Sequence, residues 1–234
     1  MRKAQHMHTK WLIPGYGLIV IVCFTIVSCQ NPSASSGQTG SSVQDTVSDS
    51  GWVSLFNGKD LSGWTQLEGK TKFAVEDHQI VATTVTHNPN SVLCTDKKYR
   101  NFVLELDIKV DSPLNSGVQI RSHLNDKGEV YGYQIEVDPS QRAWSGGIYD
   151  CRRRGWMINL DGKPDKQAAF KNGQWNHYRI RFNGDTLESW VNEIPIATMI
   201  DTLQDPVGFI GLQADGIKQG GLHARFRNIR IKTL

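Results

Sequence analysis

Hydrophobic and polar residues alternate with a period of two along most of the chain after residue 51. The clearest case is residues 102–110, where Phe, Leu, Leu, Ile and Val alternate with Val, Glu, Asp and Lys. This alternation is typical of a strand with one buried and one polar face. Similar runs predict further strands at residues 53–56, 73–76, 79–84, 92–95, 118–122, 131–138, 175–182, 186–191, 196–200, 208–213 and 223–232.

Short turns separate these runs. Asn183-Gly184 is a strong hairpin signal, and residues 192–195 form another turn. Only residues 164–170 could form a helical turn or two. Many antiparallel strands in one domain predict an all-β protein, a two-sheet antiparallel β-sandwich of the jelly-roll type rather than an up-and-down barrel. Residues 141–175 are expected to lie as a lid over one sheet.

The first 29 residues have the pattern of a targeting segment. Arg2, Lys3 and Lys10 make a basic start, and residues 18–27 are an apolar stretch too short to span a membrane comfortably. The segment ends in Ser28-Cys29, which resembles the lipobox of a bacterial lipoprotein signal. The thiol of Cys29 would then be lipidated. The alternative is an ordinary cleaved signal peptide in which Cys29 is incidental.

Residues 30–50 consist mainly of Ser, Gly, Gln, Thr and Asp, as in a flexible tether, which leaves residues 51–234 for one folded domain. We therefore expect a protein of the bacterial cell envelope, periplasmic or on the cell surface, that meets the membrane only through its N-terminal lipid. The formal net charge of +3 includes the basic signal, so the rest of the chain is nearly neutral. This charge argues against a nucleic-acid partner.

Cysteines and acidic residues give no clear metal or disulfide pattern. Export permits a disulfide between Cys94 and Cys151, but their separation in sequence is no evidence for one. Glu136, Asp138 and Asp150 carry oxygen ligands that would suit Ca²⁺ or Mn²⁺. Their spacing does not match a calcium loop, so no metal site and no cofactor are predicted.

Two neighbouring runs predict a polar face. If the apolar residues of 118–122 and 131–138 point into one core, the opposite face collects Gln119, Arg121, Gln134, Glu136 and Asp138. Carboxylates, amides and a guanidinium suit a cleft for a polyhydroxylated ligand. The alternative is the ordinary solvated face of an antiparallel sheet.

Six separated motifs carry a resemblance to a known family. They are LFNGKDLSGW (55–64), YRNFVLELD (99–107), NSGVQIR (115–121), SGGIYD (145–150), WNHYRI (175–180) and FRNIRI (226–231). Together they resemble the 3-keto-disaccharide hydrolase domain family over nearly all of residues 52–234. Two positions depart from it: Cys151 stands where relatives often carry an acidic residue, and Asp215 where they often carry His.

The resemblance implies a concanavalin A-like jelly roll that cleaves 3-keto-glycosides or 3-keto-disaccharides. The substrate would be a small glycoside supplied by a sugar 3-dehydrogenase. A ketone at carbon 3 acidifies the proton on carbon 2, so a modest base can remove it. The enolate can then expel the aglycone by β-elimination, and direct hydrolysis is the other route to the same cleavage. This reaction needs a base and an acid, but it does not need the two carboxylates at a fixed separation that ordinary glycosidases use.

We assign the catalytic roles to Glu136, Arg121 and Asp150. Glu136 would be the base, and Arg121 would stabilise the enolate oxygen or keep Glu136 ionised. Asp150, or Tyr149, would protonate the departing oxygen. Arg121 and Glu136 could instead form only a cross-strand salt bridge, and Asp150 could simply cap a turn.

The remaining predicted contacts bind substrate: Gln119, Gln134, Asp138, Tyr149, Trp144 and Trp156. The rival interpretation is a non-catalytic carbohydrate-binding domain, in which aromatic platforms and amides hold a sugar and Glu136 only accepts a hydrogen bond. A purely structural domain at the cell surface is the third interpretation, and the charged polar face argues against it.

Overall fold

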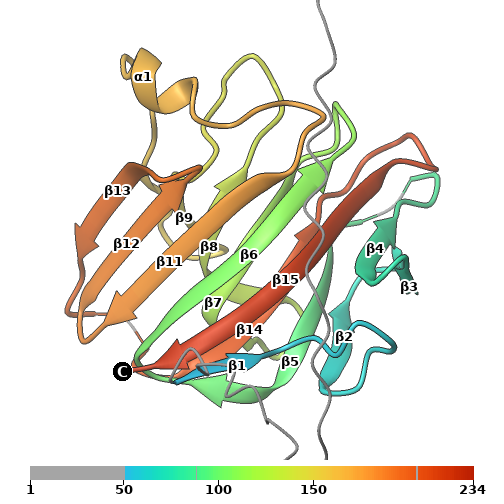
Figure 1. Ribbon diagram of the computed structural model, residues 1–234, viewed down its shortest axis with the longest axis horizontal. Helices are drawn as coiled ribbons and strands as arrows, with labels where there is room; N and C mark the ends of the chain where they lie inside the picture. The colour runs from blue at the N-terminus through green and yellow to red at the C-terminus, as the bar shows by residue number, and fades with distance from the viewer. Residues whose placement is uncertain (1–50, 88, 204) are drawn as a thin grey trace, which may run out of the picture. The chain divides into compact units, whose positions relative to one another are not determined.

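Two antiparallel sheets form the described part of the protein (Figure 1). The computed structural model describes residues 51–87, 89–203 and 205–234. The predicted signal, lipidation site at Cys29 and tether lie outside these residues. No helix in these three ranges is long and apolar enough to cross a membrane.

The first sheet contains eight strands. Seven follow one another in hydrogen-bonded order, and the short β1 (Trp52–Ser54) pairs with β15. The order is β13 (Ile194–Ile200), β12 (Thr186–Val191), β11 (Asn176–Asn183), β6 (Phe102–Val110), β15 (His223–Thr233), β4 (Gln79–Thr83) and β3 (Lys72–Glu76).

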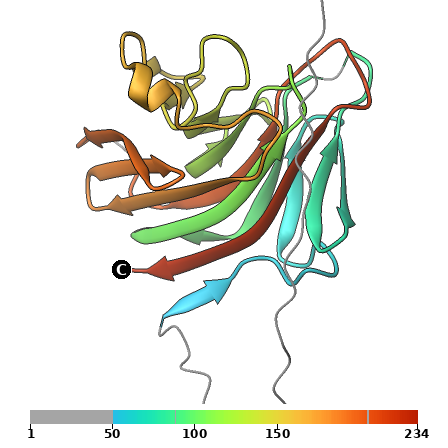
Figure 2. The ribbon, with the colours of Figure 1, turned by 45° about the horizontal axis from the view of Figure 1, so that its top comes forward.

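The second sheet contains seven strands and lies against the first (Figure 2). Its order is β10 (Gly155–Ile158), β9 (Ile148–Cys151), β8 (Val130–Val137), β7 (Ser116–Leu124), β14 (Gly208–Ala214), β5 (Ser91–Tyr99) and β2 (Trp64–Glu68). The only helix among the described residues is the single turn α1 (Pro164–Gln167).

The core lies between the sheets, where the alternating apolar residues of each strand meet. Leu104, Leu106 and Ile108 of β6 are fully buried, as are Ile120 of β7 and Ile135 of β8. The predicted all-β sandwich is confirmed, because a period of two places every second side chain of a strand in this layer.

Three strands had no counterpart in the sequence prediction: β2, β9 and β10. Each is only four or five residues long, which leaves too few positions to establish a period. Two of them, β9 and β10, lie in residues 141–175 and extend the edge of the second sheet. This excursion is therefore not simply a lid. Cys94 and Cys151 are both free thiols, so the bridge left open by the sequence is not formed.

Candidate functional site

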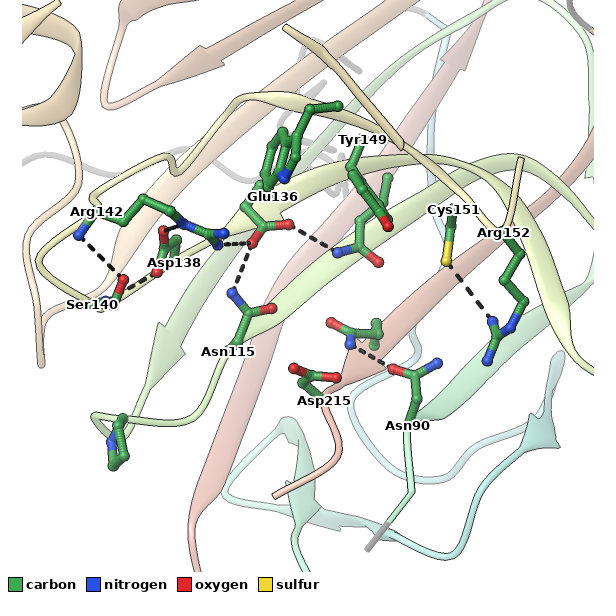
Figure 3. Close-up of a pocket in the computed structure, with 14 residues that line it drawn as sticks. Asn90, Asn115, Glu136, Asp138, Ser140, Arg142, Tyr149, Cys151, Arg152 and Asp215 are labelled. Carbon is green, nitrogen blue, oxygen red and sulfur yellow. Dashed lines mark hydrogen bonds and ion pairs between the residues drawn. The ribbon is translucent and has the colours of Figure 1, made fainter. Parts of the chain in front are cut away.

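A polar cleft of about 640 Å³ lies on the second sheet, at the end where β8 and β14 finish (Figure 3). Its walls are formed by Asn90, Pro113, Asn115, Gln134, Glu136, Asp138, Ser140, Arg142, Tyr149, Cys151, Arg152, Trp156, Gln213 and Asp215.

Glu136 is held inside this cleft by three hydrogen-bond donors. Its Oε1 accepts hydrogen bonds from Asn115 Nδ2 at 2.7 Å and from Arg142 Nη2 at 3.0 Å. Its Oε2 accepts one from Gln134 Nε2 at 3.0 Å. Figure 3 shows the amide of Asn115 and the guanidinium of Arg142 converging on the carboxylate. The residue is only 3% exposed, so the orientation of the carboxylate is fixed before any ligand arrives.

Burial raises the pKa of Glu136 to about 7. The hydrogen bonds from Asn115 and Gln134 and the charge of Arg142 lower this pKa, whereas the charge of Asp138 raises it. Desolvation outweighs the stabilising groups, because a buried carboxylate loses the water that would solvate its charge. Glu136 can therefore take up or release a proton near neutral pH.

Asp138 behaves in the opposite way, although it lies two residues further along the chain. It accepts hydrogen bonds from Arg142 Nε at 2.7 Å and from the backbone N–H groups of Ser140 at 3.0 Å and Trp144 at 3.2 Å. Burial alone would raise its pKa, but the bonds from Ser140, Arg142 and Trp144 leave that pKa below its ordinary value. Asp138 thus stays charged and anchors the guanidinium that also contacts Glu136.

Arg121 does not lie beside Glu136, so its predicted placement is wrong. The β7–β8 ladder pairs Ile120 with Tyr133 and then His123 with Tyr131, which leaves an extra residue on β7. Arg121 occupies this bulge with a φ of 43°. A bulge adds one residue to one strand, so the alternation read from the sequence no longer assigns a face at this point.

The guanidinium of Arg121 lies against β11 of the first sheet and against the turns that follow β11 and precede β6. Its Nη1 donates to Gly184 O at 3.0 Å, and its Cζ lies 3.5 Å above the centre of the Phe182 ring. Nη2 also donates to Asn101 Oδ1 at 2.9 Å. The residue is 2% exposed, and it secures the packing of the two sheets rather than lining the cleft.

The prediction that Asp150 faces the substrate is also wrong. Along β9, Tyr149 and Cys151 line the cleft, so the side chain between them points to the other face. Asp150 is fully buried there and pairs with Arg153 Nε at 2.7 Å and Arg154 Nε at 2.5 Å. The carboxylate is therefore an anchor for the arginine turn that follows β9.

The other predicted contacts divide into two groups. Tyr149 and Trp156 line the cleft with Gln134. Gln119 lies behind this wall and donates from Nε2 to Gln134 Oε1 at 2.8 Å, so it positions the amide that contacts Glu136. Trp144 packs edge-on against Trp156, with ring centres 4.8 Å apart, and supports that ring from outside the cleft wall.

Several cleft residues were missed by the sequence prediction. Arg142 follows β8 in a loop, where no periodicity applies. Asn115 belongs to a family motif but precedes the predicted strand. Cys151 and Asp215 both line the cleft. Their departure from the family pattern was the one signal in the sequence that could have pointed to them.

Gln213 is the most informative of the missed residues. It is 3% exposed, and its Nε2 donates to Asn90 Oδ1 at 2.6 Å. Its Oε1 is buried and has no hydrogen-bond partner among the described residues. An unsatisfied buried carbonyl is destabilising by about 1–3 kcal/mol, so this oxygen is suited to accept a hydrogen bond from a ligand hydroxyl.

Asp215 adds a third carboxyl group to the cleft, after Glu136 and Asp138, on the wall opposite Glu136 (Figure 3). Burial raises its pKa, while a backbone hydrogen bond from Gly216 and the charge of Arg142 lower it. The protonated form is therefore more accessible than in an ordinary aspartate.

Among the described residues, no group of three His, Cys, Asp or Glu side chains is arranged to hold a metal ion. The trio considered from the sequence does not assemble, because Asp150 points away from Glu136 and Asp138.

Residues 51–232 match the family described as the 3-keto-alpha-glucoside-1,2-lyase-like domain. The chain belongs to this family. This match confirms the family resemblance drawn from the six motifs. Among curated proteins, no sequence matches the chain.

Solved structures show the same fold at low sequence identity. A Parabacteroides distasonis protein with a provisional assignment as a glycosyl hydrolase is 20% identical, with a TM-score of 0.59 over 79% of this chain and 94% of that one. A Bacillus subtilis protein with a galectin-like fold is 12% identical, with a TM-score of 0.57 over 74% and 90%. A carbohydrate-binding module from Bacillus subtilis is 14% identical, with a TM-score of 0.52 over 73% and 96%.

Proposed function

We propose that the protein cleaves the glycosidic bond of 3-keto-glycosides, with Glu136 as the base that removes the proton from carbon 2. The observation that carries this proposal is a buried, pre-oriented carboxylate whose pKa lies near 7. A base with this pKa is partly ionised at neutral pH and still strong enough to accept a proton from an acidified carbon. Membership of the 3-keto-alpha-glucoside-1,2-lyase-like family supports the same chemistry.

Arg142 takes the electrostatic role that Arg121 cannot fill. Its Nη2 already contacts Glu136, and Asp138 holds its Nε in place. When carbon 2 loses its proton, negative charge develops on the oxygen of the carbon 3 ketone. A fixed guanidinium beside the base stabilises that charge without reorganising, which lowers the barrier for proton transfer.

The departing oxygen at carbon 1 needs a proton, and the cleft offers two donors. Tyr149 lines the cleft beside Trp156, and Asp215 has a carboxyl group whose pKa is raised by burial. We assign this role to Asp215, because a carboxylic acid is a stronger donor than a phenol near neutral pH. The enolate then collapses and the bond between carbon 1 and the aglycone oxygen breaks.

The substrate is a small glycoside. Gln213 Oε1 would accept a hydrogen bond from a ring hydroxyl, and the faces of Tyr149 and Trp156 would cover the ring. Because the substrate carries a ketone at carbon 3, an enzyme that oxidises sugars at that carbon must act before this one.

The test is to incubate the purified protein with 3-keto-glucosides and with their unoxidised parents, followed by mass spectrometry. Only the keto forms should be cleaved. A deuterium label at carbon 2 separates the two routes, because elimination loses or exchanges the label and direct hydrolysis retains it. Equal cleavage of oxidised and unoxidised substrates would contradict the proposal.

Carbohydrate binding without catalysis is the second candidate. It is favoured by the aromatic rings of Tyr149 and Trp156 in a cleft rich in amides, which is also how a binding module holds a sugar. In that case no variant would turn over the substrate, and Trp156→Ala would abolish affinity for the unoxidised glycoside.

We further propose that the protein is exported and anchored in the bacterial envelope by a lipid on Cys29. The basic start, the short apolar stretch and the lipobox-like end of residues 1–29 support this proposal. Residues 30–50 would then separate the sandwich from the membrane surface, so the protein meets the bilayer only through its lipid.

A further inference from the structure

A second cavity, of about 480 Å³, opens at the opposite end of the same strands. It takes Tyr131 from the start of β8, Phe209 from the start of β14 and His123 from the end of β7, whereas the cleft uses the other ends of β8 and β14. Tyr131 and Glu136 are five positions apart along β8, or about 16 Å of strand. The two cavities share no lining residue.

The floor of this second cavity is apolar. Cys94 and Phe209 belong to a small buried cluster that also contains Val92 and Val130, and Leu67 packs against it. This cluster is separate from the main core between the sheets. At the mouth, Leu124 is 41% exposed, so a ligand that covers it would remove apolar surface from water.

One wall is built from flat rings. The rings of His123 and Tyr131 are stacked, with centres 5.6 Å apart and an interplanar angle of 28°. Phe209 lies against His123 at 6.5 Å and 51°. Such rings offer a planar ligand both an apolar contact area and a favourable ring–ring geometry.

Two of the three hydroxyl groups that line the cavity, those of Thr65 and Thr95, already have partners within the protein. Thr65 Oγ1 donates to Asp96 Oδ1 at 2.7 Å. Thr95 Oγ1 donates to Lys97 O at 2.8 Å and accepts from Ile210 N at 3.1 Å. A sugar would have to give up the water on several hydroxyl groups here, and neither threonine hydroxyl is available to replace it. A flat ligand with one or two polar groups loses much less.

We propose that this cavity binds a planar aromatic compound with one or two hydroxyl groups, that is, a phenol. The ring lies on the His123–Tyr131 wall over the floor of Leu67, Cys94 and Phe209. Its hydroxyl faces the mouth, where Lys98 and Asp96 provide a charged donor and an acceptor. The inference does not depend on catalysis in the cleft, because none of these residues lines it.

The test is a fluorescence titration of the purified protein with 2-naphthol, which is uncharged at pH 7. Saturable binding is expected. Both Tyr131→Val and His123→Gln should weaken it by about fivefold to tenfold, because each removes one ring from the wall. Leu124→Ala, at an exposed position that tolerates substitution, should weaken it by about threefold. Unchanged urea midpoints would show that the three variants remain folded.

Two controls decide the result. The saturated analogue decahydro-2-naphthol has a similar size but no flat ring and should bind at least fivefold more weakly. Trp156→Leu, a change in the cleft, should leave 2-naphthol affinity within twofold of the original. The proposal is overturned by absent saturation, by equal affinity for the saturated alcohol, or by loss of binding in Trp156→Leu while the Tyr131 and His123 variants still bind.

Discussion

The pKa values of two carboxyl groups at the end of β8, that of Glu136 in the strand and that of Asp138 directly after it, are shifted in opposite directions. Burial raises the pKa of Glu136, whereas hydrogen bonds from Ser140, Arg142 and Trp144 overcome the same effect at Asp138 and lower its pKa. The difference comes from the loop after β8, because its backbone N–H groups point at Asp138. Glu136 is therefore suited to exchange protons, whereas Asp138 is suited to hold the guanidinium of Arg142.

Glu136→Gln should separate binding from turnover. The amide keeps the size and most of the hydrogen bonding of the side chain but cannot accept a proton. We expect the affinity for a 3-keto-glucoside to change by less than about tenfold, while turnover falls by on the order of a hundredfold or more. Asp138→Asn is the matched control, and it should retain more turnover, since Asp138 only positions Arg142. Full activity of Glu136→Gln with retention of a carbon 2 label would exclude the proposed base.

The raised pKa of Glu136 also predicts a pH effect on stability. The folded protein holds this proton up to about pH 7, whereas the unfolded chain releases it near the ordinary value of 4.5. The contribution of Glu136 to the stability of the folded protein is therefore complete below pH 4.5, and it is lost as the pH rises through 7. It amounts to roughly 3 kcal/mol for a shift of this size. Urea unfolding at pH 5 and pH 8 should show this loss in the original protein, and Glu136→Gln should remove most of it.

At the scale of single elements, the bulge in β7 decides which arginine serves which purpose. An extra residue after Ile120 turns Arg121 away from the cleft and places its guanidinium over Phe182 of β11. The site then receives its guanidinium from the loop after β8, where Arg142 reaches both carboxylates. Because the bulge breaks the strand periodicity, Arg121, which was predicted to be catalytic, instead packs between the two sheets.

The two faces of β6 should respond differently to substitution. Leu106 is fully buried between the sheets, so Leu106→Asp places a charge in the core and should unfold the protein, at a cost of more than about 4 kcal/mol. Asp107 lies on the other face and accepts hydrogen bonds from His177 and Asn228. Asp107→Asn should cost about 1 kcal/mol. Thermal unfolding measures both, and equal losses would mean that the faces are reversed.

At the scale of the whole molecule, the sandwich places two chemically different cavities at opposite ends of one sheet. The cleft is rich in carboxylates and amides, whereas the second cavity has an apolar floor and an aromatic wall. Both use β8 and β14, because each of these strands is antiparallel to β7 between them, so the two start at one end of the sheet and finish at the other.

Attachment to the membrane can be tested on the intact chain. Cys29→Ser removes the thiol that would be lipidated, so the protein should leave the membrane fraction or remain unprocessed. Cys23→Ser, within the same segment, should have no such effect. Detergent phase partitioning after expression measures this, and partitioning of Cys29→Ser like the original protein would contradict the anchor.

The sandwich and the central residues of the cleft could be predicted from the sequence alone. Strand periodicity is a local property of the backbone, so the alternation of residues 131–138 is enough to place Gln134, Glu136 and Asp138 on one face. The six motifs likewise established the family from the sequence.

The rest of the site depends on contacts between segments that are far apart in the chain. Gln213 and Asp215 reach the cleft of Glu136 from β14 and the residue after it, nearly eighty residues away in the chain, and local periodicity carries no information about such neighbours. The bulge at Arg121 and the ion pairs that hold Asp150 depend on partners from other elements. The pKa of Glu136 depends on how completely those elements exclude water, which is a property of the packed molecule and not of its sequence pattern.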